Sequence, residues 1–219
     1  MPSIDHEMLV AMLDRLKLTA IRDQLDTLLD EAARSDMTLR EALAFMVRCE
    51  IARRDERRIS MASKIGQFPF VRELDGFDFD AQPSLDQRQI RELETCRWIA
   101  HGDMVLFLGP PGTGKTHLAA ALGREAIRQN DSVQFVTAAT LEAMLAKAHG
   151  DGSLDKQLTI LAWPKLLIID ELGYLPFEAN AAHLFFRLVS RRYTRGSILI
   201  ISNRSVGEWA SVFGDAKIS

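Results

Sequence analysis

The sequence has little cysteine, no long apolar run and no surplus of positive charge, and each absence removes a class of protein. Its two cysteines, Cys49 and Cys96, lie far apart, with no CxxC pair or histidine cluster, which argues against a disulfide framework or a zinc site. Apolar runs such as 166–169 and 198–201 fall far short of the ~20 residues that cross a bilayer. We therefore expect reduced, structural thiols and no membrane-spanning helix.

The overall charge gives no sign of a nucleic-acid-binding protein. The sequence has 27 basic and 30 acidic residues, for a net charge of −3. Its opening, MPSIDHEMLV, carries acids where a secretory signal carries positive charge, and no small-residue cleavage site follows an apolar stretch. A cytoplasmic location is therefore the expectation.

The 219 residues are long enough for one full domain and a smaller one. Between residues 5 and 63 apolar side chains recur at helical spacing, which predicts three amphipathic helices. Thr38 and Glu41 form a capping box, so the third helix should begin there. We expect an all-α domain over residues 1–66 and a Gly, Pro and Phe-containing linker over 67–84.

From residue 85 to 219, apolar runs alternate with helical patterns, which predicts an α/β domain with a parallel sheet flanked by helices. The expected strands cover 104–108, 133–137, 166–170 and 198–202. The expected helices cover 85–100, 115–129, 139–149, 153–162 and 179–193.

A glycine-rich segment directly follows the first expected strand. Residues 109–116, GPPGTGKT, match GxxxxGK[ST] and open a helix, which is the context that a phosphate-binding P-loop requires. Glycines let the backbone amides and the positive helix end face an anion. Lys115 should meet the β and γ phosphates, and the Thr116 hydroxyl should ligate the Mg²⁺ that bridges them.

The predicted nucleotide-binding residues are Gly109, Pro110, Pro111, Gly112, Thr113, Gly114, Lys115, Thr116 and His117. Of these, we expect the ring of His117 to pack or hydrogen-bond locally rather than to act in catalysis. Phe77 and Phe79 are weaker candidates, for a place beside the adenine.

About fifty residues later, a buried apolar strand ends in two acids, Asp170 and Glu171. The pattern is typical of a Walker B strand and predicts that Asp170, together with Thr116, holds Mg²⁺. A carboxylate near the γ phosphate can orient and polarise the attacking water, so Glu171 is the predicted catalytic base.

The fourth expected strand brings Asn203 to the same edge of the sheet, where ligands of open α/β folds gather. An amide there can position water, so Lys115, Glu171 and Asn203 are the predicted catalytic residues. The alternative is that Asn203 serves only as a turn residue or cap, because Ser205 and Glu208 form a second plausible capping box.

Together, GPPGTGKTHLAAALG, LLIIDELGYLPF and IISNRS resemble the AAA+ ATPases of the IstB-type transposition helper family, relatives of the DnaC-type helicase loaders. Residues 13–70 resemble the N-terminal domain of the same family. The resemblance implies a P-loop NTPase (AAA+) fold, with Walker A at Gly109–Thr116, Walker B at Asp170 and Glu171, and sensor 1 at Asn203.

The same resemblance implies ATP and Mg²⁺ as cofactors and ATP-dependent self-assembly into an oligomer. It implies duplex DNA and a cognate transposase as partners, the transposase being stimulated by the assembly. A DnaC-type loader of a replicative helicase is the alternative function.

The sequence departs from the family near its end. After residues 212–216 the family continues through a helix, a last strand and the sensor 2 arginine, whereas this sequence closes with Lys217, Ile218 and Ser219. Without that last strand the Walker A strand would be an open edge, which invites pairing with another chain. A truncated remnant that binds ATP but turns it over little is therefore a further alternative.

Two groups of basic residues remain. The surplus between residues 48 and 64 suggests contact with DNA phosphates by Arg53, Arg54, Arg57 and Arg58, although a solvated helix face explains it equally well. Arg191, Arg192 and Arg195 precede Asn203, and we expect them to form a solvated helix end.

Overall fold

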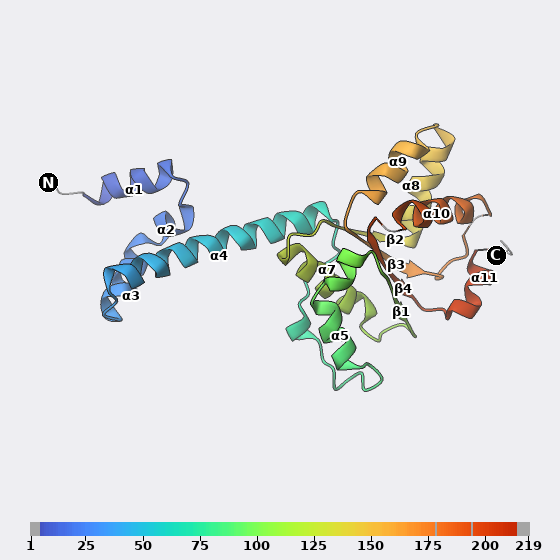
Figure 1. Ribbon diagram of the computed structural model, residues 1–219, viewed down its shortest axis with the longest axis horizontal. Coiled ribbons are helices and arrows are strands. Elements are labelled where there is room, and N and C mark those ends of the chain that lie inside the picture. The colour runs from blue at the N-terminus through green and yellow to red at the C-terminus, as the bar shows by residue number, and fades with distance from the viewer. Residues whose placement is uncertain (1–4, 178, 194, 214–219) are drawn as a thin grey trace. The chain divides into compact units, whose positions relative to one another are not determined.

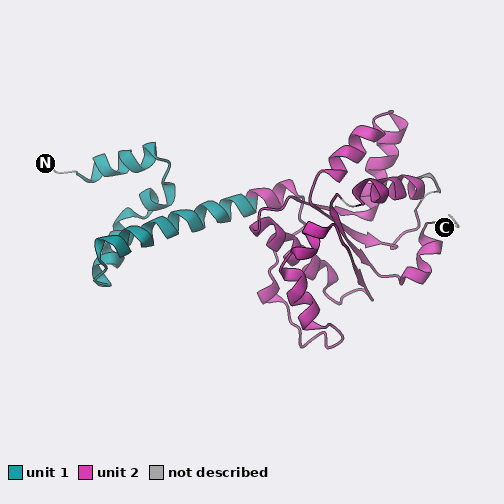
Figure 2. Ribbon diagram, in the orientation of Figure 1, with its two compact units in different colours: residues 1–60 teal, residues 61–219 magenta. Residues whose placement is uncertain are grey.

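The computed structural model describes residues 5–177, 179–193 and 195–213, so the closing residues Lys217, Ile218 and Ser219 lie outside the described part. The chain forms two compact units, residues 1–60 and 61–219 (Figure 2). The domain limits expected at residues 66 and 84 stay predictions. Within the described part, no helix is long and apolar enough to cross a membrane.

The first unit is helical, as expected. Its helices are α1 (His6–Arg15), α2 (Thr19–Asp23), α3 (Leu25–Arg34) and the long α4 (Leu39–Ile65), which continues past residue 60 (Figure 1). The second expected helix is in fact two, because Gln24 leaves helical geometry between α2 and α3. The capping box at the start of α4 is confirmed, with the Thr38 amide donating to Glu41 at 2.8 Å and the Glu41 amide to Thr38 Oγ1 at 3.4 Å.

A buried carboxylate fixes α2 in this unit. Glu50, on α4, accepts hydrogen bonds from the amides of Ala20 and Ile21 at 2.7 and 3.2 Å, and from Arg54 Nε at 2.9 Å. Burial acts to raise the pKa of Glu50, but Arg54 and the two amides outweigh it and hold the pKa below its ordinary value. The carboxylate therefore satisfies amides that α2, which has no side-chain cap, leaves open.

The second unit is built on a parallel sheet of four strands among the described residues. They are β1 (Met104–Leu108), β2 (Val133–Thr137), β3 (Leu166–Leu172) and β4 (Ser197–Ser202), in the order β1-β4-β3-β2 (Figure 1). All four expected strands are confirmed. The side chains of β4 are at most 3% exposed, which explains why its sequence is an unbroken apolar run between two serines.

Helices cover both faces of this sheet, so the predicted α/β architecture is confirmed. In chain order the unit contains η1 (Leu74–Gly76), α5 (Gln87–Glu94), α6 (Arg97–His101), α7 (Lys115–Arg128), α8 (Ala138–Gly150), α9 (Leu154–Ala162), α10 (Ala179–Arg192), η2 (Val206–Glu208) and α11 (Trp209–Val212). The main core lies between the sheet and α8, α9 and α10. The capping box of Ser205 and Glu208 is confirmed at η2.

One expected helix is wrong. The segment 85–100 is broken into α5 and α6 by Cys96, whose φ of 57° is left-handed. The indole Nε1 of Trp98 donates to the carbonyl of Leu93 at 2.9 Å across this break. Cys96 is buried as expected, and burial raises the pKa of its thiol to about 12.

Among the described strands, β1 is an edge strand that pairs with β4 alone. Three of its side chains, Met104, Leu106 and Leu108, are 37–49% exposed, and Phe107 is half-buried. The strand that leads into the glycine-rich loop is therefore covered much less than β3 and β4.

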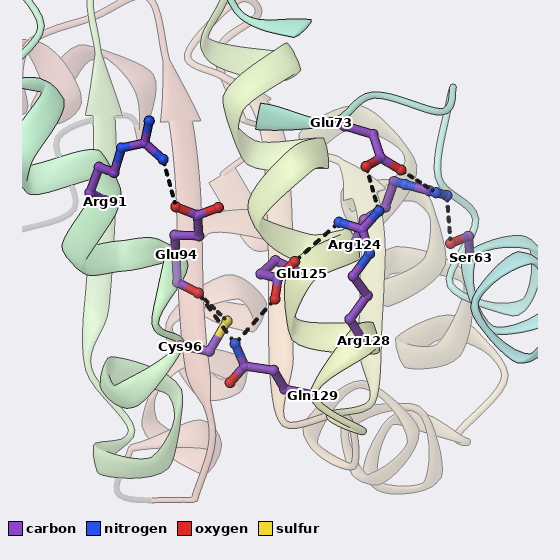
Figure 3. A network of polar contacts seen from close by, with 9 residues as sticks. All are labelled: Ser63, Glu73, Arg91, Glu94, Cys96, Arg124, Glu125, Arg128 and Gln129. Atoms are coloured by element: carbon purple, nitrogen blue, oxygen red, sulfur yellow. Dashed lines mark hydrogen bonds and ion pairs between the residues drawn. The ribbon is translucent and has the colours of Figure 1, made fainter. Parts of the chain in front are cut away.

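A network of polar contacts fastens the segment after α4 to α7 (Figure 3). The Glu73 carboxylate pairs with Arg124 at 3.0 Å and with Arg128, and Arg124 also donates to the hydroxyl of Ser63 at 3.4 Å. The hydrogen bond from Arg128, and to a smaller extent that from Arg124, hold the pKa of Glu73 below its ordinary value, although partial burial acts to raise it. Residues 67–84 thus pack on the helix that begins at Lys115.

Candidate nucleotide-binding site

The glycine-rich loop adopts a conformation that its sequence explains. Gly109, Gly112 and Gly114 have φ angles of 153°, 81° and 80°, which residues with a Cβ rarely adopt. At Gly114 a Cβ would also lie 2.6 Å from a ring carbon of Phe77. The loop ends at Lys115, the first residue of α7, so the unpaired amides of that helix end open onto the loop.

Lys115 is tied to this loop by its own amine. The Nζ atom donates to the carbonyls of Gly109 and Pro110 at 2.8 and 2.7 Å and to the hydroxyl of Thr113 at 3.3 Å. Burial lowers the pKa of Lys115, and the charge of Asp170 partly opposes this shift. A partly desolvated ammonium is therefore held at the helix end, where an anion would gain most from it.

Asp170 lies beside the same helix end and is only 6% exposed. Burial raises its pKa, while hydrogen bonds from the Glu171 amide and the Thr116 hydroxyl and the charge of Lys115 act in the opposite direction. The amide of Glu171 lies 2.7 Å from Asp170 Oδ1. The predicted pair, Thr116 and Asp170, is thus in direct contact.

Glu171 is exposed and lies on an irregularity of β3. Ile169 is paired with Ile200 and Leu172 with Ser202, so β3 has one more residue than β4 between the two pairs. Glu171 itself has a φ of 62°, a left-handed conformation that few non-glycine residues adopt. The bulge turns consecutive acids to different environments, with Asp170 buried and Glu171 exposed.

Asn203 follows β4 and is half-buried. Its Oδ1 atom is buried and accepts no hydrogen bond within the described residues. Buried polar atoms are nearly always satisfied, so an unpaired one beside a cavity needs an explanation, and a donor that arrives with a ligand is one. The water-positioning role of Asn203 and the alternative of a simple turn residue both stay predictions.

These elements meet at one cavity of about 450 Å³, formed at the carboxyl end of the sheet. Its lining residues are Pro111, Gly112, Thr113, Gly114, Lys115, Thr116, His117, Asp170, Glu171, Tyr174, Ile201, Ser202 and Asn203. Gly109 and Pro110 instead line an adjacent hollow of about 300 Å³, which Lys115 and Thr113 share. All three predicted catalytic residues are therefore brought together.

Three lining residues were missed by the sequence analysis, namely Tyr174, Ile201 and Ser202. Ile201 and Ser202 end the strand that precedes Asn203, but its apolar run gives no sign that these two residues themselves reach the cavity. Tyr174 lies three residues after Glu171. It is 71% exposed at the cavity, and nothing in the sequence indicates that exposure.

His117 makes local contacts, as expected. Its Nε2 lies 3.1 Å from the carbonyl of Glu73, and its ring packs edge-on against Phe77 with 5.3 Å between centroids. Phe77 in turn meets Phe79 at 4.9 Å, and both line a hollow of about 170 Å³. Contact of Phe77 and Phe79 with adenine stays a prediction.

The basic residues of α4 are engaged within their own unit. Arg54 donates to the carbonyl of Lys17 at 2.8 Å and Arg57 to the hydroxyl of Thr19 at 3.0 Å, while Arg58 pairs with Asp55 at 3.5 Å. The charge of Arg53 makes a small contribution to lowering the pKa of Asp23. The contacts of Arg54 and Arg57 hold the start of α2 on α4, so these two arginines have a structural use whether or not they contact DNA.

The expectation for Arg192 is wrong. Instead of forming a solvated helix end, its side chain is fully buried and donates to the carbonyls of Leu161, Lys165 and Ser197 at 2.8, 3.3 and 2.7 Å. Its neighbour Arg191 lies on the surface and pairs with Asp155 at 3.1 Å. Neither arginine lines the cavity described above.

Comparison with known proteins agrees with this geometry. The family model of IstB-like ATP-binding proteins matches residues 11–219. The chain is 39% identical to the putative ATP-binding protein of insertion sequence IS5376 from Geobacillus stearothermophilus, over 94% of this chain and 82% of the relative. It is also 39% identical to that of insertion sequence IS21 from Pseudomonas aeruginosa, over 96% of this chain and 79% of the relative.

A solved structure shares the fold. The crystal structure of the DnaC helicase loader superposes with a TM-score of 0.51 and 22% identity, over 58% of this chain and 78% of that one.

Proposed function

This chain belongs to the family of IstB-like ATP-binding proteins, and from that premise we propose that it hydrolyses ATP with Mg²⁺ and acts as a helper of transposition. In this proposal ATP drives self-assembly on duplex DNA, and the assembly stimulates a cognate transposase. The observation that carries the catalytic part is the convergence of Lys115, Glu171 and Asn203 on one cavity.

The chain's own residues divide the work of binding and chemistry. The amides of the glycine-rich loop and the end of α7 bind the phosphates, and Lys115 adds a positive charge at the β and γ phosphates. Glu171 accepts a proton from the attacking water as its oxygen bonds to the γ phosphorus and the bond to the β-γ bridging oxygen breaks. The amide of Asn203, whose oxygen has no donor among the described residues, holds that water in line.

The residues present fit a Mg²⁺ ion. Thr116 and Asp170 supply oxygen donors in direct contact with each other, and oxygen is what this ion prefers. No group of three or more His, Cys, Asp or Glu side chains gathers as a metal cluster in the described part of the chain, which suits an ion completed by phosphates and water. When bound, it would neutralise charge on the phosphates, and Thr116 and Asp170 would hold it.

The proposed partners rest on the relatives, which are named as ATP-binding proteins of insertion sequences. On this chain, Arg53, Arg54, Arg57 and Arg58 are the proposed phosphate contacts. Arg54 and Arg57 are the exposed members of this set, whereas Arg53 and Arg58 are half-buried.

The test is the binding of the full chain to long duplex DNA, with and without Mg-ATP, across a salt series, together with phosphate release. We expect binding that needs ATP and falls steeply with salt, as contacts to phosphates do. Neutralising Arg53, Arg54, Arg57 and Arg58 together should flatten the salt dependence, while R34Q, on α3, controls for the loss of an exposed arginine elsewhere in the same unit.

Two outcomes contradict the proposal. ATP binding without phosphate release would remove the catalytic part and favour a nucleotide-binding remnant. ATP binding and hydrolysis without DNA binding, combined with capture of a replicative helicase rather than a transposase, would favour the helicase-loader function.

A further inference from the structure

Ser202, at the carboxyl end of β4, is hydrogen-bonded to all three motifs of the site. It is fully buried and directly precedes Asn203. Its Oγ donates to the carbonyl of Leu172 at 2.7 Å and accepts from the amide of Arg204 at 3.0 Å. Its backbone carbonyl accepts from the amide of Gly109 at 3.2 Å. The P-loop, the segment after Glu171 and the segment after Asn203 thus meet at one residue.

The carbonyl that Ser202 binds belongs to the residue next to Glu171. Glu171 is left-handed at φ 62°, and such a conformation persists only where neighbouring contacts fix it. Leu172 is paired with Ser202 at the end of the bulge, and the amide of Tyr174 donates to the carbonyl of Glu171 at 3.2 Å. The hydroxyl of Ser202 is therefore one of the contacts that hold the bulge in this form.

The turn beyond the bulge is packed against the same residues. Gly173 has a φ of 85°, and a Cβ there would lie 3.0 Å from Arg204 Cγ and 3.4 Å from Ser202 Oγ. A hydroxyl supplies one donor and two acceptor positions, so Ser202 can donate to Leu172 and accept from Arg204 at the same time. The two loops that carry Glu171 and Asn203 are therefore joined through a single oxygen atom.

We propose that Ser202 is a positioning residue for ATP hydrolysis, which acts through Leu172 and Arg204 to fix Glu171 relative to Asn203. Ser202 lines the cavity, but its hydroxyl is engaged by Leu172 and Arg204, so its effect on the reaction passes through these neighbours. The proposal rests on the proposed function, because it concerns the rate of the same reaction.

The chain supplies a matched control in Ser197, at the opposite end of β4. Ser197 is also fully buried, and its Oγ also donates to a backbone carbonyl, that of Trp98 at 3.1 Å. It does not line the cavity. The variants S202A and S197A therefore remove the same group from the same strand, one beside the site and one away from it.

The experiment measures kcat and KM for ATP hydrolysis, and the Kd for Mg-ATP, of the full chain and both variants in the presence of duplex DNA. We expect S202A to lower kcat by roughly ten- to a hundredfold, since small misplacements of catalytic groups have effects of this size. KM and Kd should change little, and S197A should keep the wild-type kcat. The variant S202T, which keeps the hydroxyl, should restore most of the activity.

Equal kcat values for S202A and S197A would overturn the proposal, as would a loss in S202A that appears only in Kd. Amide hydrogen exchange separates this from a failure of the proposed function. If the wild-type chain binds ATP but releases no phosphate, the hydrolytic function fails by itself. Faster exchange of segments 171–175 and 203–206 in S202A alone would then support the positioning role, and unchanged exchange would contradict it.

Discussion

The two ends of the parallel sheet use polar groups in opposite ways. At the amino end, the side chains of Ser197 and Arg192 donate hydrogen bonds to buried backbone carbonyls, those of Trp98, Leu161 and Ser197. At the carboxyl end, Asp170 is buried with a raised pKa, Glu171 is left-handed and Asn203 Oδ1 has no donor in the described part of the chain. One end stabilises the fold, while the other keeps unfavourable groups that a bound nucleotide would satisfy.

The amino end is not free of cost, since the Nε of buried Arg192 also has no partner among the described residues. Burial lowers the pKa of this arginine to about 10. The two ends therefore differ in how their buried polar groups are satisfied. At the amino end, three hydrogen bonds offset the free-energy cost of burying Arg192, whereas at the carboxyl end the Asn203 oxygen has no partner in the described part of the chain. The comparison predicts that changes at the carboxyl end reduce activity and spare stability, and that changes at the amino end do the reverse.

The largest expected effect is on catalysis at the carboxyl end. The variant E171Q removes the carboxylate that accepts a proton while keeping its size, so kcat should fall about 10²- to 10⁴-fold. Affinity for Mg-ATP should persist, because Glu171 is not a proposed ligand of the phosphates. Phosphate release and nucleotide binding measure the two quantities. A variant with wild-type kcat would remove Glu171 from the mechanism.

The converse change lies at the amino end. The variant R192A removes the hydrogen bonds to the carbonyls of Leu161, Lys165 and Ser197, of which that of Lys165 keeps the Ser197 amide as a donor, and opens a cavity, so the free energy of unfolding should fall by about 3 kcal/mol. The neighbouring R191A, which breaks an ion pair with Asp155 and a hydrogen bond to Thr159 at the surface, should lose less than about 1 kcal/mol. Urea unfolding measures both. Should R192A not fold, R192K provides a milder change at the same place, and a stability equal to wild type would contradict the comparison.

The smallest expected effect is a gain in stability, at the carboxyl end, and it is opposite in sign to the loss expected for R192A. The variant D170N removes a buried charge yet can still accept a hydrogen bond from Thr116, so the protein without nucleotide should gain about 1 kcal/mol in unfolding free energy. At the same time, the dependence of ATP binding on Mg²⁺ should be lost. Thermal unfolding and nucleotide titrations with and without Mg²⁺ measure these changes.

This gain should depend on pH. The folded-state pKa of Asp170 is raised, so the cost of its charge is present at neutral pH and disappears as pH falls through that value. The difference between D170N and the wild type should therefore be largest near pH 7 and vanish below about pH 3, where the carboxyl is protonated in both states. A difference that grows towards low pH would show that burial is not its cause.

Much of the α/β unit could be predicted from sequence. The four strands are short apolar runs. The motif GPPGTGKT predicts a P-loop by itself, because its three glycines stand at the positions that adopt positive φ angles. Asp170, Glu171 and Asn203 were found because parallel strands bring their carboxyl ends to one edge. In each case the signal is local, or depends on a rule that holds for every open parallel sheet.

What could not be predicted depends on contacts between distant residues. The break at Cys96 is accompanied by a hydrogen bond from Trp98 to the carbonyl of Leu93, which no periodicity reveals. Arg192 looks like an ordinary basic residue at a helix end until its three carbonyl partners are in place. From the sequence, Ser202 is only the polar residue at the end of a strand. Its contact with Leu172 depends on the bulge in the neighbouring strand β3.

The carboxylate of Glu50 has a consequence for the order of folding. α2 has five residues, fewer than an isolated helix needs to persist in water, and two of its first amides are held by a side chain some thirty positions later. We therefore expect α2 to remain unstructured in the folding transition state and to form only after α4 has appeared. In kinetic terms, E50Q should mainly accelerate unfolding of the helical unit and leave its folding rate almost unchanged.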